Sequence, residues 1–446
     1  MNDKRPDHPA GETPDAATVP PILDLRIEKL VTGGTGLARH EGQAVFVPLT
    51  APGDDVRVEI VERKKGFLRA SLTELVTPGA GRREAPCPHY GECGGCDLQH
   101  LDDTHQAAGK RDIVVDCFSR LGKLDVADLV EGPAPDAPLG YRNRIRLFAS
   151  PAGFYGMMRR GTHDVVPLDA CLLMPEAFNR DILPWLRFLP PVEQVVVRLD
   201  GQGGWLVSIF GQPARMKIMK KILAALPAGE PPAPGCVGLL YNNLPLWGRD
   251  HLVYEVAGHK YRVGAQSFFQ GNLAATEDAV ATVRAWLDEV ATGDLFCDLF
   301  CGVGLFSLAL ADRFVQVIAV EVDRNACRDA ANNFARAEAA GRRVALHEGP
   351  VTRILARDDL AAPEAWASAT VLVDPPRAGL GRNGVKALLA RRPRHLVYMS
   401  CDPATLARDT AGFAEGGYAL RKLKVMDFFP QTAHIECLAL LERTDP

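Results

Sequence analysis

The spacing of apolar side chains changes several times along this chain of 446 residues. Near the start, from Ile22 to about residue 78, apolar and polar residues alternate over short stretches such as Val56, Val58 and Ile60, and turn-forming clusters separate these stretches. Alternation with a period of two predicts half-buried strands. We therefore expect a small β-barrel of the OB type over residues 22–78.

The next region, residues 79–265, combines a cysteine-bearing loop with strand-like runs such as Arg144–Phe148 and Gln194–Leu199. We therefore expect an α+β central domain, but the pattern does not predict the order of its strands. From residue 266 to 446 apolar strands alternate with Ala- and Arg-rich helices. That alternation predicts an α/β domain with a doubly wound, Rossmann-like parallel sheet. Its first helix should bury one apolar face, made of Val280, Val283, Trp286 and Leu287.

The composition of the chain restricts which segments can fold and which partners are expected. Residues 1–21 are rich in Pro, Asp, Thr and Ala, which predicts a disordered tail. No stretch approaches the run of about 20 apolar residues that spans a bilayer, and no secretory signal is visible. We expect a cytoplasmic monomer without membrane contact. The net charge of -4 argues against non-specific coating of nucleic acid but leaves room for a local basic groove.

Four cations of the barrel, Arg63, Lys64, Lys65 and Arg69, could contact RNA phosphates. On charge alone a solvated hairpin tip is the better interpretation.

A nucleoside site is indicated where the strand Asp294–Phe300 runs into Cys301-Gly302-Val303-Gly304. Glycines at such a turn let a ligand approach the backbone, and Glu321, at the end of the next strand, suits ribose hydroxyls. A dinucleotide site would need a third glycine, where Ser307 stands. S-adenosylmethionine has no pyrophosphate, so two glycines and Asp298 could suffice. The alternative is an ordinary strand-to-helix turn.

A second signal is Asp374-Pro-Pro-Arg377, which follows an apolar strand. The carboxyl ends of parallel strands carry the chemistry of open α/β sheets, and the prolines stiffen the loop beside Asp374. A strand that simply stops at prolines is the alternative. Methyltransferases that act on amino groups have an aromatic residue where Arg377 stands, which argues against adenine N6 chemistry.

The strand His395–Met399 ends in Ser400-Cys401-Asp402, which puts a thiol at the same edge. Uracil C5 becomes nucleophilic only after a thiolate adds at C6, and the C5 proton must then be removed. Cys401 is the candidate nucleophile. Glu436 is the candidate base, on a final strand beginning at Ala433 whose alternation puts His434 and Glu436 on one side. The alternatives are a buried small cysteine and a solvated carboxylate.

Three cysteines lie close together in Cys87-Pro-His-Tyr-Gly-Glu-Cys93-Gly-Gly-Cys96, and Cys171 is a candidate fourth ligand. Four thiolates suit either a zinc ion or a [4Fe-4S] cluster, and His89 or His100 could replace one thiolate at zinc.

Together these motifs resemble the RNA uracil-5-methyltransferase family, and most closely its 23S rRNA branch, which carries an N-terminal TRAM barrel and a [4Fe-4S] cluster. The resemblance covers nearly the whole chain after the tail. It is carried by the following motifs: Cys87, Cys93, Cys96 and Cys171; Ser267-Phe-Phe-Gln270; Asp298-Leu-Phe300-Cys-Gly302; Glu321; Asp374-Pro-Pro-Arg-Ala-Gly-Leu380; Ser400-Cys401; and His434-Ile-Glu436.

The resemblance implies that S-adenosylmethionine is the methyl donor, that Cys401 is the nucleophile and Glu436 the base, and that the four cysteines bind iron and sulfur. It implies an RNA partner, 23S rRNA before tRNA, with Arg142 in Tyr141-Arg142-Asn143 at the RNA site. The cofactor contacts that it implies, together with the glycine of the turn, are Gln270, Phe300, Gly302, Glu321 and Asp374.

Two positions depart from the family pattern: Asp402 replaces the usual Asn, and Leu305 an often polar residue. Asp402 would raise the pKa of the neighbouring thiol unless a cation or hydrogen bond compensates. Two other functions remain open here, RNA cytosine-5 methylation and a non-enzymatic iron-sulfur RNA-binding protein.

Overall fold

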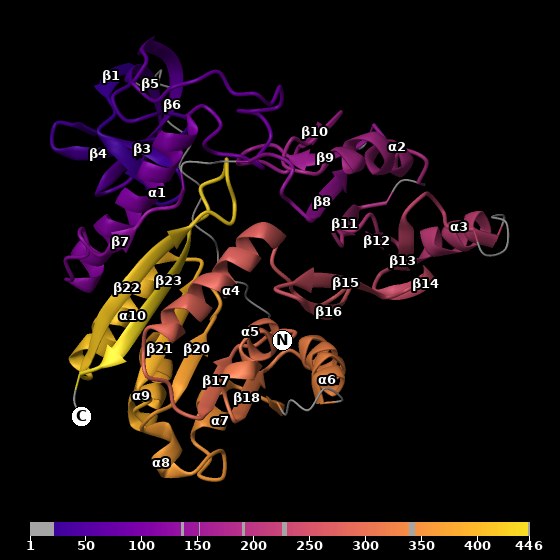
Figure 1. Cartoon of the computed structure of the whole chain (residues 1–446). Helices are drawn as coiled ribbons and strands as arrows, with labels where there is room; N and C mark the ends of the chain where they lie inside the picture. The colour runs from indigo at the N-terminus through magenta and orange to yellow at the C-terminus, as the bar shows by residue number, and fades with distance from the viewer. Residues whose placement is uncertain are drawn as a thin grey trace, which may run out of the picture. The chain divides into compact units, whose positions relative to one another are not determined.

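The computed structural model describes residues 22–134, 138–150, 152–189, 192–224, 230–338 and 344–444 (Figure 1). The expected tail, residues 1–21, lies outside the described residues. The chain divides into two compact units, Met1–Lys29 with Thr35–Ala80, and Leu30–Gly34 with Gly81–Pro446. In the described parts of the chain, no helix is long and apolar enough to cross a membrane.

The N-terminal region forms a sheet of six strands, as the alternating pattern predicts. Its apolar core contains Val45, Val47, Val56 and Val58, which point to the same side of their strands. The strand order is β1-β5-β6-β4-β3-β2, in which β4 and β6 run parallel. The strands are β1 (Ile22–Arg26), β2 (Lys29–Val31), β3 (Thr35–His40), β4 (Gln43–Val47), β5 (Asp55–Arg63) and β6 (Phe67–Thr77).

A second sheet, of seven strands, occupies the middle of the sequence. The two strands predicted there are present as β8 and β11, which pair with each other in antiparallel fashion. The order is β10-β9-β8-β11-β12-β13-β14, and only the β12 and β13 pair is parallel within it. The strands are β8 (Arg144–Ala149), β9 (Tyr155–Met158), β10 (Val165–Pro167), β11 (Gln194–Leu199), β12 (Trp205–Phe210), β13 (Cys236–Tyr241) and β14 (Leu244–Gly248). The helical segments are η2 (Phe178–Ile182), α2 (Leu183–Leu186) and α3 (Pro213–Ala224).

The hairpin of β15 (His251–Val256) and β16 (His259–Gly264) connects this sheet to the C-terminal half. Helix α4 (Leu273–Asp288) follows, and its predicted apolar face is buried. Residues of the hairpin, such as Tyr254 and Tyr261, share one apolar core with α4 and with the C-terminal sheet. The hairpin therefore packs as part of the C-terminal half.

The C-terminal half is built on an eight-stranded sheet of order β19-β18-β17-β20-β21-β23-β22-β7. Its first five strands are parallel, and β23 runs antiparallel to β21. The strands are β7 (Val130–Glu131), β17 (Leu295–Leu299), β18 (Gln316–Glu321), β19 (Val344–Glu348), β20 (Thr370–Val373), β21 (His395–Ser400), β22 (Tyr418–Met426) and β23 (Glu436–Arg443). The predicted doubly wound sheet is confirmed.

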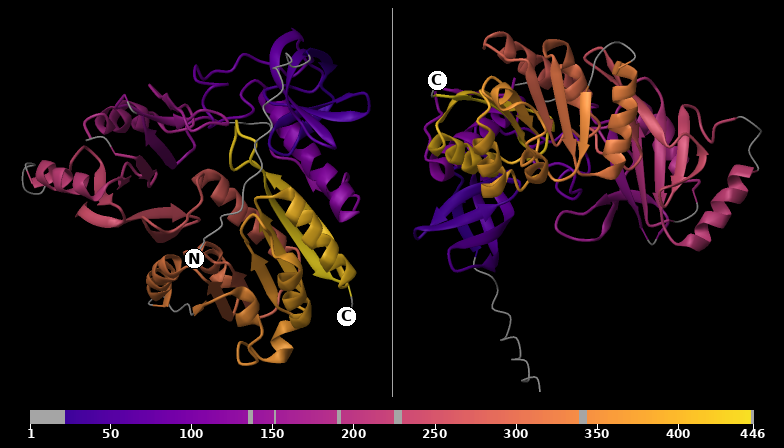
Figure 2. Two further views of the ribbon diagram at one scale, coloured as in Figure 1. Left: turned by 180° about the vertical axis from the view of Figure 1, so that it is seen from behind. Right: turned by 90° about the horizontal axis from the view of Figure 1, so that it is seen from below.

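Helices cover both faces of this sheet, as the views from behind and below show (Figure 2). Helix α1, from the segment that follows the cysteine loop, packs against α10 and β22. The segments are α1 (Asp103–Cys117), η1 (Phe118–Gly122), α5 (Leu305–Ala309), η3 (Ala311–Arg313), α6 (Arg324–Glu338), α7 (Val351–Leu355), α8 (Pro363–Trp366), α9 (Gly381–Arg391) and α10 (Pro403–Glu415).

Candidate active site

The candidate site lies at the edge of the C-terminal sheet where the parallel strands end. Phe300 follows β17, Glu321 ends β18, Asp374 follows β20 and Cys401 follows β21. Because β23 runs antiparallel to β21, its first residue, Glu436, lies at the same edge. The structure therefore brings the predicted nucleophile, base and acidic residues to one edge of the sheet.

The turn after β17 has the geometry of a ligand cradle. Phe300 (φ 66°) and Gly302 (φ 57°) both have left-handed backbone, which a non-glycine residue adopts at a cost and which is common at functional sites. The Gly302 N–H donates to Glu321 Oε2 at 2.9 Å, and the other oxygen of Glu321 accepts from the N–H groups of Val322 and Asp323. No other atom lies within 4 Å of where a Gly302 Cβ would be, so a ligand can approach this backbone.

Ser307, which stands where a dinucleotide-binding motif has its third glycine, forms hydrogen bonds to Asp298. Its N–H and its hydroxyl donate to Asp298 Oδ2 at 2.7 and 2.6 Å, and both residues are buried. Burial raises the pKa of Asp298 to about 7, against the effect of these two bonds. Asp298 thus holds the start of α5 against the end of β17.

Gln270 belongs to a segment that is fixed at several points. Its backbone carbonyl accepts from the Asn143 side chain at 2.9 Å, and the Ser267 hydroxyl donates to the buried Asp329 at 2.6 Å. The Gln270 side chain is buried. The bond from Asn143 therefore connects the segment Tyr141-Arg142-Asn143, which precedes β8, to the C-terminal half.

The thiol and the candidate base influence each other electrostatically. Burial raises the pKa of Cys401 to about 11, and the charges of Glu436 and Asp374 add to that rise while Arg377 opposes it. Burial also raises the pKa of Glu436 well above its ordinary value, with a further contribution from Asp374. Glu436 is buried, so the alternative of a solvated carboxylate does not apply. In the free protein Cys401 is held as a thiol.

Burial has the same effect on a second carboxylate at this edge, that of Asp374. Burial raises the pKa of Asp374 to about 7, and the charges of Asp298 and Glu321 contribute. The three acidic groups are within electrostatic range of one another, and their combined charge favours a cation nearby.

Asp402, which the sequence marks as an extra charge beside the thiol, caps helix α10. Its Oδ1 accepts from the Thr405 N–H at 2.9 Å. The partial positive charge of a helix N-terminus stabilises the ionised carboxylate in this position. The charges that raise the pKa of Cys401 are those of Glu436 and Asp374.

Arg377 and His434 form a pair at this edge, 2.9 Å apart between Nη2 and Nδ1. A guanidinium can only donate, so Nδ1 accepts and the imidazole is neutral. Loss of solvent, and then the charge of Arg377, lowers the pKa of His434. His434 lies in the loop before β23, so the final strand begins at Glu436 and not at Ala433 as predicted, because pairing with the neighbouring strands begins only near Glu436. Sequence reasoning noted Arg377 only as a missing aromatic residue.

The four candidate metal ligands lie near one another. Each of the thiols Cys87, Cys93, Cys96 and Cys171 is within electrostatic range of at least two of the others. Hydrogen bonds reach three of the sulfurs, from Gly95 to Cys93, from Gln99 to Cys96 and from Leu173 to Cys171. Burial raises the pKa of the same three thiols, and the charge of Arg142 opposes that rise. Among the described residues, however, no three His, Cys, Asp or Glu side chains are arranged to hold a single metal ion.

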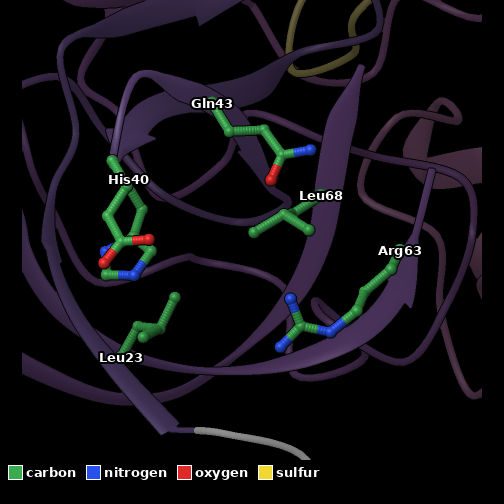
Figure 3. A pocket seen from close by; sticks show the side chains of 6 residues that line it. Leu23, His40, Gln43, Arg63 and Leu68 are labelled. Atoms are coloured by element: carbon green, nitrogen blue, oxygen red, sulfur yellow. The ribbon is translucent and has the colours of Figure 1, made fainter. Parts of the chain in front are cut away.

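Two of the four barrel cations pair within the barrel, since Lys64 and Arg69 both contact Glu62. Arg63 lines a surface hollow of 270 Å³ together with His40 and Gln43 (Figure 3). This hollow belongs to the N-terminal unit and contains none of the residues of the sheet edge.

Comparison with known proteins gives consistent results. Residues 249–444 match the family described as tRNA (uracil-5-)-methyltransferase, and residues 19–73 match the TRAM domain. The chain is 33% identical to an uncharacterized RNA methyltransferase of Aquifex aeolicus, over 95% of this chain and 99% of that protein. It is 32% identical to the 23S rRNA (uracil(1939)-C(5))-methyltransferase RlmD of Pectobacterium atrosepticum, over 94% and 93% of the two chains.

Among solved structures, the fold is similar to that of the Pyrococcus abyssi tRNA (uracil-54, C5)-methyltransferase in complex with S-adenosyl-L-homocysteine. The TM-score is 0.69 at 24% identity, over 94% of this chain and 99% of that one.

Proposed function

Because the chain belongs to the family of S-adenosylmethionine-dependent RNA (uracil-5-)-methyltransferases, we propose that it methylates C5 of one uridine through a covalent bond between Cys401 and C6. The observation that carries the mechanism is the position of Cys401 and Glu436 on neighbouring strands at one sheet edge, beside Asp374. Family membership sets aside the cytosine-directed and the non-enzymatic alternatives.

In this mechanism the Cys401 thiolate adds to C6 of the uracil, and the electron pair of the C5–C6 bond moves toward O4. C5 then takes the methyl group, and S-adenosylhomocysteine is left. Glu436 removes the C5 proton, the electron pair reforms the C5–C6 double bond, and the sulfur leaves as a thiolate. A carboxylate with a raised pKa is a stronger base once it is ionised, which suits Glu436 to this step.

Cofactor binding would also prepare the thiol. The sulfonium is a positive charge, and the neighbouring negative charges of Asp298, Glu321 and Asp374 would favour its binding beside them. Neutralising these charges lowers the pKa of Cys401, since Asp374 contributes to its rise. Thiolate would therefore form once the methyl donor is in place.

We assign the cofactor contacts to the side chains and backbone around the cradle. Three backbone N–H groups fix the Glu321 carboxylate, whose oxygens can accept further hydrogen bonds from ribose hydroxyls, and Gly302 leaves space above the turn. Phe300 and Asp374 lie at the same edge, and Gln270 belongs to the anchored segment before α4. The proposed contacts are Gln270, Phe300, Gly302, Glu321 and Asp374.

We also propose that Cys87, Cys93, Cys96 and Cys171 hold a [4Fe-4S] cluster. In such a cluster each cysteine binds a different iron, so the sulfurs need not converge on one point as they do around zinc. Four neighbouring thiols with hydrogen-bond donors to three of them fit this requirement. Anaerobically purified protein should contain iron and sulfide, and a colourless protein with zinc would refute the cluster.

The proposed substrate is 23S rRNA, because RlmD, which by its name acts on 23S rRNA, is 32% identical over nearly the full length of both chains. A tRNA uridine is the second candidate. Single-stranded or looped RNA suits either, since the uracil must leave its stack before a thiol can reach C6. The barrel and Arg142 are the proposed RNA contacts. The cytoplasmic location and the monomeric state remain predictions.

The covalent step is tested with RNA in which 5-fluorouridine replaces uridine. Fluorine at C5 cannot be removed as a proton, so the enzyme should stop as a methylated adduct that survives denaturing electrophoresis and maps to Cys401 by mass spectrometry. A Cys401→Ala protein should give no adduct. Methylation by that variant would refute covalent catalysis.

A further inference from the structure

The loop that precedes the proposed base is anchored to an unusual degree. Residues 427–435, here called the base loop, connect β22 to β23 and lead directly into Glu436. At its centre Gln431 is 1% exposed and has left-handed backbone, with φ 69°. A non-glycine residue keeps such a backbone only where its surroundings hold it.

Gln431 is held by an exchange of hydrogen bonds with Gln106 of helix α1. Gln106 Nε2 donates to Gln431 Oε1 at 2.9 Å, and the Gln431 backbone N–H donates to Gln106 Oε1 at 3.0 Å. Arg83 also donates to Gln431 Oε1, at 3.2 Å. The Gln431 carbonyl accepts the N–H groups of Asp97 and Leu98, both at 3.0 Å. The side chain, the backbone N–H and the backbone carbonyl of Gln431 are thus all hydrogen-bonded to residues 83–106, which precede β7.

The same segment holds the base loop on either side of Gln431. The Lys110 ammonium, 1% exposed, donates to Asp427 at 2.7 Å and to the Phe429 carbonyl at 3.2 Å. Asp97 Oδ2 accepts the Ala433 N–H at 3.0 Å. Three anchors therefore lie within the nine residues before the base.

The thiol has a separate support. Cys401 follows β21, and the turn after it is fixed by the Asp402 cap on the Thr405 N–H. Releasing the base loop should therefore move Glu436 and leave Cys401 in place.

We propose that Gln106 and Gln431 are positioning residues for proton abstraction: their paired amides hold the base loop so that Glu436 reaches the C5 proton. The proposal rests on the function proposed above, in which Glu436 is the base. Misplacing the base delays removal of the C5 proton, while thiol addition and methyl transfer continue. The methylated enzyme–RNA adduct should then accumulate on ordinary uridine RNA.

The test uses the full-length protein with Gln106→Met, which keeps side-chain length but removes the amide, and separately Gln431→Gly, which keeps the positive φ. Each variant should show about tenfold slower turnover, as expected for a displaced catalytic group, with less than about twofold change in KM for RNA. In single-turnover reactions with radiolabelled methyl donor, each should retain a denaturation-stable, methyl-labelled adduct at several times the level of the unaltered protein.

Val196→Ala, a core truncation in the central sheet, serves as the control for a general loss of stability. It should lower the melting temperature without adduct accumulation. The Glu436→Gln protein distinguishes the claim that Glu436 is the base from the claim that Gln106 and Gln431 position it. If this variant accumulates no adduct, Glu436 is not the base. If Glu436→Gln accumulates adduct and a folded Gln106→Met or Gln431→Gly protein does not, the positioning role is refuted.

Discussion

The charge of the cofactor should control the ionisation of Cys401. Without a ligand the pKa of this thiol is raised to about 11, in part by Asp374. The sulfonium can be replaced by two ligands of similar shape: sinefungin, which carries an ammonium there, and S-adenosylhomocysteine, which is neutral. Because a cation offsets the carboxylates, the pKa of Cys401 should be lower with sinefungin than with S-adenosylhomocysteine.

The size of the effect follows from Coulomb's law. A unit charge about 8 Å from the sulfur, at an effective dielectric constant of about 20, changes the ionisation free energy by about 2 kcal/mol. That corresponds to a decrease in pKa of about 1.5. At pH 8 the thiolate fraction then rises about 30-fold, from about one in a thousand.

The assay is the rate of Cys401 alkylation by iodoacetamide as a function of pH, followed by peptide mass spectrometry. Comparing the two ligands controls for shielding of the thiol, because both occupy the same space. In an Asp374→Asn protein the unliganded pKa should be lower, since one negative neighbour is gone. Identical pH profiles with sinefungin and S-adenosylhomocysteine would refute the reasoning.

Three further predictions follow from local geometry. Gly304→Ala should lower the free energy of unfolding by at least about 2 kcal/mol, because a Cβ there would lie 2.3 Å from the Phe334 ring and φ is 91°. Gly302→Ala meets no atom within 4 Å, so only the strain of its φ of 57° remains, which costs about 1 kcal/mol. Gly302→Ala should therefore destabilise less than Gly304→Ala and weaken S-adenosylmethionine binding measured by calorimetry, and the reverse order of stabilities would contradict this. Lys110→Met should lower the free energy of unfolding in urea by about 3 kcal/mol, because it leaves the largely buried Asp427 carboxylate without its ion-pair partner. A second change, Asp427→Leu, should restore part of the loss. Arg377→Met should raise the pKa of His434 in an NMR titration, since a positive neighbour that disfavours the imidazolium is removed; an unchanged or lower pKa would contradict the pairing.

Much of the site could be predicted from the sequence because it depends on strand ends. The apolar runs before Cys301, Asp374 and Cys401 define three parallel strands, and the ends of parallel strands meet at one edge. The final strand begins at Glu436 and not at Ala433, because the alternation of residue types does not show where pairing with a neighbouring strand starts.

The anchors of the base loop could not be predicted in the same way. The buried face of α1 carries Gln106 and Lys110, so it lacks the apolar periodicity by which helices are recognised in sequence. The left-handed backbone of Gln431 has no signal in residue type, since glycine and asparagine are the usual markers. The effect of Asp402 also depended on geometry, because only the structure shows its carboxylate bound to the start of α10.

The central claim is that this protein makes 5-methyluridine with Cys401. Its most direct test is nucleoside mass spectrometry of fractionated 23S rRNA and tRNA from cells that lack the protein, complemented with either the unaltered protein or Cys401→Ala. The account predicts that one 5-methyluridine disappears from 23S rRNA, that the unaltered protein restores it, and that Cys401→Ala does not. An unchanged 5-methyluridine content in both RNA fractions, or restoration by Cys401→Ala, would contradict it.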